Sequence, residues 1–209
     1  MTKIKFYSLW LCLICIGVFI LQNLISEFTG LFVLNKSALY NYEIWRFVTS
    51  VFLHENIVHL LYNLFALALF GFILEKLIGS KRFLIVFFAS GIIANLIAVN
   101  FYNSSLGVSG AIYGILGCLA VLRPLMMIWA FGFPMPMFIA AIVWVGAGIL
   151  GVFMPSNVGD IAHLSGIGIG FLIGLILRLT RKKQNPSYSY KIEIPDSYMN
   201  EWENRYMKE

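Results

Sequence analysis

The feature that most constrains this chain is a succession of apolar stretches, most of them long enough to cross a membrane as a helix. A hydrocarbon core about 30 Å thick is crossed by roughly 20 residues of α-helix. Six apolar segments are visible, over residues 6–25, 56–74, 83–101, 108–122, 135–154 and 161–177. Only 12% of the residues are charged, where a soluble domain carries about 25%. We therefore predict an all-α integral membrane protein with six transmembrane helices within residues 1–183.

Basic residues flank these segments unevenly. If the N-terminus lies inside the cell, the outside loops hold only Lys36 and Arg46. The inside segments then hold Lys3, Lys5, Lys76, Lys81, Arg82, Arg123, Arg178, Arg181, Lys182 and Lys183. This asymmetry predicts a multi-pass protein of the cell membrane with both termini in the cytoplasm, and a polar cytoplasmic tail over residues 184–209. The basic residues cluster at segment ends rather than on one face, so nucleic acid is not an expected partner.

The fourth apolar segment is shorter than the others. At about 1.5 Å per residue, residues 108–122 span roughly 22 Å as a helix, so this helix must begin below one membrane surface. Ser109 then lies at a helix N-terminus inside the protein, where free backbone N–H groups can bind a ligand. The flanking Gly107 and Gly110 permit close backbone approach to a substrate or to a neighbouring helix.

Other stretches carry structural signals. Residues 26–53 are long and mixed in character, and we expect an ordered external loop that is partly embedded in the membrane. Pro134 and Pro136 interrupt the fifth segment, so its regular helix is expected to begin near Met135. The cysteines lie in apolar segments without the spacing of metal ligands and are expected to be buried small hydrophobes: Cys12, Cys15 and Cys118.

Polar side chains inside membrane spans are costly, so each is a candidate for function. His59 and Asn63 are four residues apart and share one helical face. His163 shares a face of the last segment with small residues, which are Gly166, Gly170 and Gly174. The fourth segment offers a matching small-residue face, made of Gly110, Gly114 and Gly117. Packing these two faces together would bring Ser109 towards His163.

These residue types suit acyl transfer, most simply peptide hydrolysis without a metal or cofactor. A serine hydroxyl becomes a strong nucleophile when an adjacent histidine takes its proton, which assigns these roles to Ser109 and His163. The tetrahedral oxyanion then needs preorganised donors. The backbone N–H of Ser109 and the side chains of His59 and Asn63 are the candidates.

The chain resembles the rhomboid intramembrane serine proteases. Residues 107–111, Gly-Val-Ser-Gly-Ala, are similar to their GxSGA-type motif, residues 59–63 to their HxxxN motif, and residues 162–166 to their AHxxG motif. The pairs Trp45-Arg46 and Glu75-Lys76 also match, and the resemblance covers residues 43–177 in order.

This resemblance implies the six-helix rhomboid fold with a short central fourth helix. It also implies a Ser109–His163 dyad that opens to a water-filled cavity on the outer side. Tyr113 matches the position whose ring supports the catalytic histidine, and Gly107, Gly110 and Gly166 are the supporting motif glycines. The implied substrates are single-span membrane proteins cut near the outer membrane face. The region of Pro134 and Pro136 and the fifth span correspond to the side that admits substrate.

Two other functions remain open from the sequence. One is a catalytically inactive rhomboid-like protein that binds membrane clients, although such relatives lose the serine or the histidine and this chain has both. The other is a transporter or channel that uses the short helix as an ion site, but neither inverted repeats nor a polar path across the membrane is visible.

Two ionisable residues near the candidate site are expected to be structural. Asp160 follows a glycine and precedes an apolar run, which predicts a helix N-cap that accepts a bond from the N–H of Ala162 or His163. It is therefore not expected to complete a Ser-His-Asp triad. His54 lies about 140° from His59 on a helical wheel and is expected to be structural or to lie at the water interface.

Overall fold

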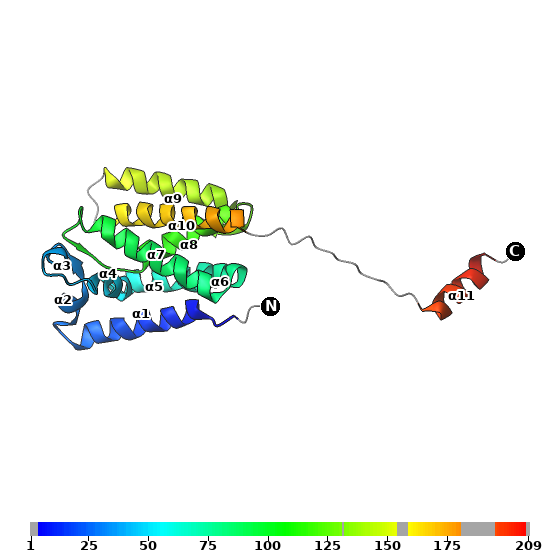
Figure 1. The fold of residues 1–209 in the computed structure, drawn as a ribbon, viewed down its shortest axis with the longest axis horizontal. Coiled ribbons are helices and arrows are strands. Elements are labelled where there is room, and N and C mark those ends of the chain that lie inside the picture. Colours follow the sequence, from blue (N-terminus) through cyan, green and yellow to red (C-terminus); the bar gives the residue numbers. More distant parts are fainter. Residues whose placement is uncertain (1–3, 131, 154–158, 181–194, 208–209) are drawn as a thin grey trace.

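The protein is a bundle of helices that lie side by side along one axis, as Figure 1 shows. This computed structural model describes residues 4–130, 132–153, 159–180 and 195–207. The apolar segments form α1 (Tyr7–Leu24), α5 (Ile57–Ala66), η2 (Leu67–Gly71), α6 (Phe72–Ile78), α7 (Ser80–Ala98), α8 (Ser109–Leu122), α9 (Met137–Val152) and α10 (Asp160–Thr180). Here η2 is a π-helical turn that joins α5 and α6 into one continuous helix.

Within the described ranges, four helices are long and apolar enough to cross a membrane, which indicates a multi-pass membrane protein. They are Tyr7–Leu24, Ile57–Ile78, Ser80–Ala98 and Asp160–Thr180. Two further apolar helices, α8 and α9, are shorter. Polar residues 184–194 of the predicted tail lie outside the described part, and the remainder includes an eleven-residue helix, α11 (Asp196–Tyr206).

The connection between α1 and α5 is an ordered loop tied together by one arginine. It contains α2 (Phe28–Phe32), β1 (Leu34–Asn35), α3 (Ser37–Tyr40), α4 (Arg46–Thr49) and η1 (Ser50–Phe52), and β1 pairs with β2 (Ser104–Ser105). The Arg46 guanidinium donates to the carbonyls of Gly30 at 2.6 Å and Val33 at 2.8 Å. It also pairs with Glu43 at 2.7 Å. This buried guanidinium ties the end of α2 to the turn of residues 43–46.

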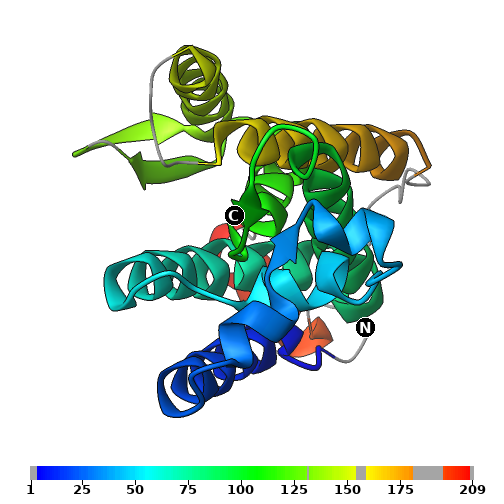
Figure 2. The same cartoon turned by 90° about the vertical axis from the view of Figure 1, so that its left-hand side faces the viewer.

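The region before α9 differs from the prediction. The helix begins at Met137 rather than near Met135, because the two prolines lie in a strand. Strand β4 (Phe133–Pro136) pairs with β3 (Met127–Ala130) in an antiparallel hairpin. In Figure 2 this hairpin extends sideways from the bundle next to α9. No strand is predicted from these prolines, yet a strand of a two-stranded hairpin has a free edge and tolerates them.

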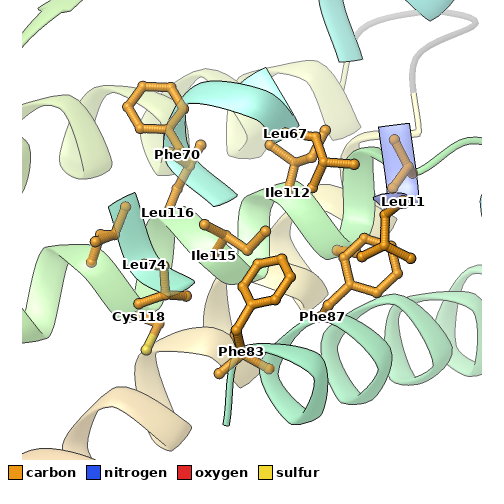
Figure 3. Packing of buried hydrophobic residues seen from close by; sticks show 14 of the residues in the cluster. Leu11, Leu67, Phe70, Leu74, Phe83, Phe87, Ile112, Ile115, Leu116 and Cys118 are labelled. Carbon is orange, nitrogen blue, oxygen red and sulfur yellow. The ribbon is translucent and has the colours of Figure 1, made fainter. Parts of the chain in front are cut away.

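The core is centred on α8. Figure 3 shows Ile112, Ile115 and Leu116 of this helix packed between residues of the second and third spans. The largest fully buried side chains around them include Leu67, Leu74, Phe83 and Phe87. Most of α8 is buried, so the short helix is surrounded by protein rather than exposed along its length. The three cysteines are buried and unpaired, Cys12 and Cys15 in α1 and Cys118 in α8.

The predicted contact between the two glycine faces is confirmed. A methyl group added at Gly166 would overlap the carbonyl of Gly110, and one added at Gly170 would overlap the backbone of Gly114. One added at Gly117 would overlap the carbonyl of Ile167. Helices α8 and α10 therefore touch backbone to backbone, a separation that only glycine permits.

Candidate functional site

The α8–α10 contact brings together the two side chains that the sequence singled out. Ser109 is the first residue of α8, and His163 lies in the first turn of α10. The Ser109 Oγ and the His163 Nε2 are 2.8 Å apart, within hydrogen-bond distance. A serine and a histidine that are 54 positions apart in the chain thus have the geometry that a nucleophile and its base require.

The imidazole of His163 rests on the ring of Tyr113. The two ring centroids are 4.3 Å apart and the planes differ by 2°, which is a stacked arrangement. Tyr113 comes from the second turn of α8, so the helix that presents the serine also supports the histidine. This contact and the bond to Ser109 together restrict the orientation of the imidazole.

Gly107 places the other predicted histidine beside the serine. Its φ of 115° lies in the left-handed region, which favours glycine. A methyl group at this position would come within 2.9 Å of the His59 ring, and the Ser109 Oγ lies 3.9 Å from the same point. His59 is held at the start of α5 by the N-cap Asn56, whose side chain accepts its backbone N–H at 2.8 Å. The imidazole of His59 therefore lies against the turn that leads into Ser109.

The side-chain amide of Asn63 is a hydrogen-bond donor that has no acceptor among the described residues. The residue is buried, and its side-chain nitrogen has no hydrogen-bond partner within the part of the chain that the structure describes. Such a group is costly unless a ligand or water satisfies it. The backbone N–H of Ser109, at the first position of α8, is likewise not used by its own helix. Asn63 and Ser109 line the same cavity.

The cavity has a volume of about 770 Å³ and a wall of mixed polar and apolar character. Besides the residues already described, it is lined by Glu55, Asn95, Tyr102, Asn103 and Ser104. This volume is in the range of cavities that bind small molecules or peptide segments. A reacting carbonyl placed near Ser109 would therefore have both donors and water within reach.

His54 lies behind His59 and is structural, one of the two roles expected. His54 is only 1% exposed. Its ring contacts that of His59 edge to face, with the ring centroids 5.3 Å apart. The Nδ1 lies 3.2 Å from the carbonyl of Phe52, so the neutral ring donates there. Burial, with a smaller effect of neighbouring His59, lowers the pKa of His54 from its ordinary value of 6.5 to about 4.

Sequence reasoning missed Gln22, which fixes the backbone of His54. From α1, its side chain accepts the N–H of His54 at 3.0 Å and donates to the carbonyl of His54 at 3.2 Å. Gln22 and His54 are 32 residues apart, and no local sequence pattern predicts their contact. A glutamine near the end of a mainly apolar helix was the one available signal.

Asp160 is not the N-cap that the sequence predicted. Helix α10 begins at Asp160 itself, and the backbone N–H of His163 donates to the carbonyl of Gly159 at 3.0 Å. The N–H of Ile161 donates to the Tyr102 hydroxyl at 3.0 Å. The Asp160 carboxylate lies against Gly151 of α9, which has no side chain to exclude it. The helix thus starts one residue earlier than predicted, and Tyr102 and Gly151, both distant in sequence, contact its first residues.

Comparison with known proteins agrees with the motifs. The model of the Rhomboid domain matches residues 41–180. The putative rhomboid protease YdcA of Bacillus subtilis is 34% identical over 139 residues, which cover 65% of this chain and 68% of that protein. Rhomboid protease GlpG of Haemophilus influenzae is 25% identical over 179 residues, covering 84% and 92%.

The plant relatives are longer. RHOMBOID-like protein 1 of Arabidopsis thaliana is 30% identical over 153 residues, which cover 72% of this chain but only 38% of that protein. The chain spans less than half the length of three such Arabidopsis relatives. The similarity to these longer proteins therefore concerns one part of them.

Proposed function

This chain belongs to the rhomboid family, and from that premise we propose that it is a serine endopeptidase that cleaves peptide bonds within the membrane. The observation that carries the proposal is the 2.8 Å contact between the Ser109 Oγ and the His163 Nε2, two residues that line one cavity. In the proposed architecture all six apolar helices cross the membrane, with α8 as the short central one. The substrates are then transmembrane segments of single-span proteins.

The chemistry divides into two steps. The Ser109 Oγ attacks the scissile carbonyl while the His163 Nε2 takes its proton, and the same imidazole then protonates the leaving amine. Water from the cavity attacks the acyl-enzyme, with His163 again as the base. No metal or cofactor enters either step.

The oxyanion of each tetrahedral intermediate would be stabilised by donors on one side of the cavity. The candidates are the backbone N–H of Ser109 and the side chains of His59 and Asn63. Support comes from the unpartnered nitrogen of Asn63 and from the position of His59 against Gly107. Donors fixed before the reaction stabilise the developing charge without reorganisation.

Covalent labelling of the purified chain with a fluorophosphonate tests the proposal. An activated serine displaces fluoride and forms an Oγ–P bond, so the wild type should be labelled and Ser109→Ala should not. In parallel, Ser109→Ala, His163→Ala and the double variant should each lose nearly all cleavage of a transmembrane reporter. The double variant should lose little more than either single one, because the two groups act as a unit.

The results separate the alternatives. A folded wild-type protein that neither reacts with the probe nor cleaves a reporter, yet retains membrane proteins, would be the inactive client-binding relative. Cleavage by Ser109→Ala at the wild-type rate would reject the mechanism.

The proposed orientation has both termini in the cytoplasm and the cavity at the outer face. It rests on the distribution of basic residues, which favours the inside for the end of the bundle that holds Lys76 and Arg123. Single cysteines introduced into a cysteine-free background test it. Positions 81 and 184 should react only from the inside, and positions 36 and 104 only from the outside.

A further inference from the structure

A second hollow lies at the end of the bundle opposite Ser109. It is an open groove of about 760 Å³ between the end of α6 and the turn after α8. Two cations line it, Lys76 from α6 and Arg123 from the C-terminus of α8, and both are exposed. None of its lining residues belongs to the cavity around Ser109, so the two hollows are separate sites.

Neither cation of this groove has an acidic partner among the residues that the structure describes. Across residues 4–130, 132–153 and 159–180, the one ion pair is that of Arg46 with Glu43, in the loop near the other end of the bundle. Glu75 is the nearest acid in sequence to Lys76, but it is fully buried. It accepts instead from the backbone N–H groups of Tyr7 and Ser8 and from the Ser80 hydroxyl.

The remaining contacts of the two cations leave their charges available. The Lys76 Nζ lies 4.2 Å from the centroid of the Phe72 ring, a cation–π contact that orients the ammonium without neutralising it. Arg123 follows the last turn of α8, and its backbone N–H bonds to Leu119. A ligand with two or more anionic oxygens would satisfy both side chains.

The rest of the groove is apolar. Its walls include Ile73, Leu77, Leu122 and Leu125, and Leu125 is 75% exposed. The hairpin that follows also presents large apolar side chains, with Trp129 exposed on β3 and Phe133 on β4. Aromatic side chains of this kind are typical of the membrane–water interface. The groove thus offers cations to a headgroup and an apolar wall to an acyl chain.

We propose that this groove binds an anionic phospholipid, with the phosphate between Lys76 and Arg123 and an acyl chain along the apolar wall. Charge complementarity selects the occupant, because basic pockets between helices at an anionic leaflet favour such headgroups. The same end of the bundle carries further basic residues that would face that leaflet: Lys5, Lys81, Arg82 and Arg178. The α11 helix carries acidic side chains and is the competing occupant that an experiment must exclude.

Lipid retention measures binding without reference to proteolysis. The full chain, purified and exchanged into nanodiscs of mixed phosphatidylglycerol and phosphatidylcholine, is released from them and its bound lipids are counted by native mass spectrometry. The wild type should retain one phosphatidylglycerol in preference to phosphatidylcholine. Lys76→Gln/Arg123→Gln should lose this preference by roughly 10- to 30-fold, since each cation near an anionic surface contributes about fivefold to binding.

The matched control is Lys81→Gln/Arg82→Gln, which removes the same charge at the same end but outside the groove. It should stay within about twofold of the wild type. The exchange variant Lys76→Arg/Arg123→Lys should retain phosphatidylglycerol, which shows that loss in the glutamine variant is not misfolding. Equal loss in both glutamine pairs would overturn the site, as would a preference for phosphatidylglycerol that appears only after residues 184–209 are deleted. The latter result would identify the tail as occupant of the groove.

Discussion

The imidazole of His163 and the phenol ring of Tyr113 lie parallel, 4.3 Å apart, with an angle of 2° between their planes. The tyrosine is four residues after Ser109 on the same helix, so it lies one turn below the proposed nucleophile. One helix therefore fixes both the position of the serine and the plane of the base. Lateral displacement of the imidazole would cost the stacking contact as well as the hydrogen bond.

Loss of this support should lower kcat while the fold persists. In Tyr113→Ala the ring under the imidazole is removed, and we expect kcat on a transmembrane reporter to fall by about 10²-fold, the effect typical of a misplaced catalytic group. Tyr113→Phe keeps the ring and should stay within a few-fold of the wild type. An equal loss in both variants would assign the effect to the hydroxyl and not to stacking.

A substitution at Asn63 is expected to change catalytic activity without lowering stability. Asn63→Leu replaces a buried donor without a partner by an apolar group of similar size, so the melting temperature should stay the same or rise. If the amide stabilises the oxyanion, kcat should fall by about 10²–10³. Unchanged kcat with a lower melting temperature would make Asn63 a packing residue.

The glycine contact gives a matched pair of alanine variants on α10. The added methyl of Gly170→Ala would overlap the Gly114 backbone, and overpacking of this kind costs about 1–3 kcal/mol or more. A methyl at Gly168 meets nothing within 4 Å, and alanine favours a helix by up to about 1 kcal/mol. Thermal unfolding in detergent should therefore show a marked drop for Gly170→Ala and none for Gly168→Ala. Equal melting temperatures would contradict the backbone contact.

The lowered pKa of His54 predicts that the protein loses stability in mild acid. Because its pKa is lowered to about 4 in the fold from 6.5, the unfolded chain binds the proton more readily. The stabilising effect of the neutral ring is therefore complete above pH 6.5 and is lost progressively as the pH falls from 6.5 towards 4. One pKa unit corresponds to about 1.4 kcal/mol, so the whole effect is at most a few kcal/mol.

The measurement is the difference between two melting curves as a function of pH. His54→Gln cannot titrate, so its stability relative to the wild type should improve on going from pH 7 to pH 5. His163 is present in both proteins and cancels in this comparison, and the smaller interaction of His54 with His59 adds to the difference in the same direction. A difference that does not vary with pH would show that His54 does not titrate in this range.

The activity of an Asp160 variant distinguishes a Ser-His dyad from a Ser-His-Asp triad. Its carboxylate lies against Gly151, while the imidazole of His163 contacts Ser109 and Tyr113. We therefore expect Asp160→Asn to keep most of the activity on the reporter. In a triad the same change misorients the base and lowers kcat by about 10⁴. A loss of that size would assign Asp160 a catalytic role.

The parts of the fold that depend on local periodicity could be predicted from the sequence. Hydropathy located the apolar helices, because the length of a span is set by the membrane. The spacing of Gly166, Gly170 and Gly174 located the surface that contacts α8, because small residues four apart mark one face. The pairing of Ser109 with His163 followed from that contact.

The parts that depend on distant contacts could not be predicted. Gln22 bonds to the backbone of His54, and Tyr102 bonds to the backbone of Ile161. The residues of these pairs are 32 and 59 positions apart, and no sequence pattern links them. The β3–β4 hairpin was missed because Pro134 and Pro136 break helices and central strands but are compatible with an edge. The unpartnered nitrogen of Asn63 likewise required the surrounding side chains to be placed.

The order of helices along the chain has a consequence for biosynthesis. Ser109 is made 54 residues before His163, which at about 5–20 residues per second is a delay of roughly 3–10 s. During that interval Ser109 lacks both His163 and the α10 glycines that pack against α8. Under the proposed mechanism the nascent protein gains proteolytic activity only when α10 docks, and a product truncated before α10 has none.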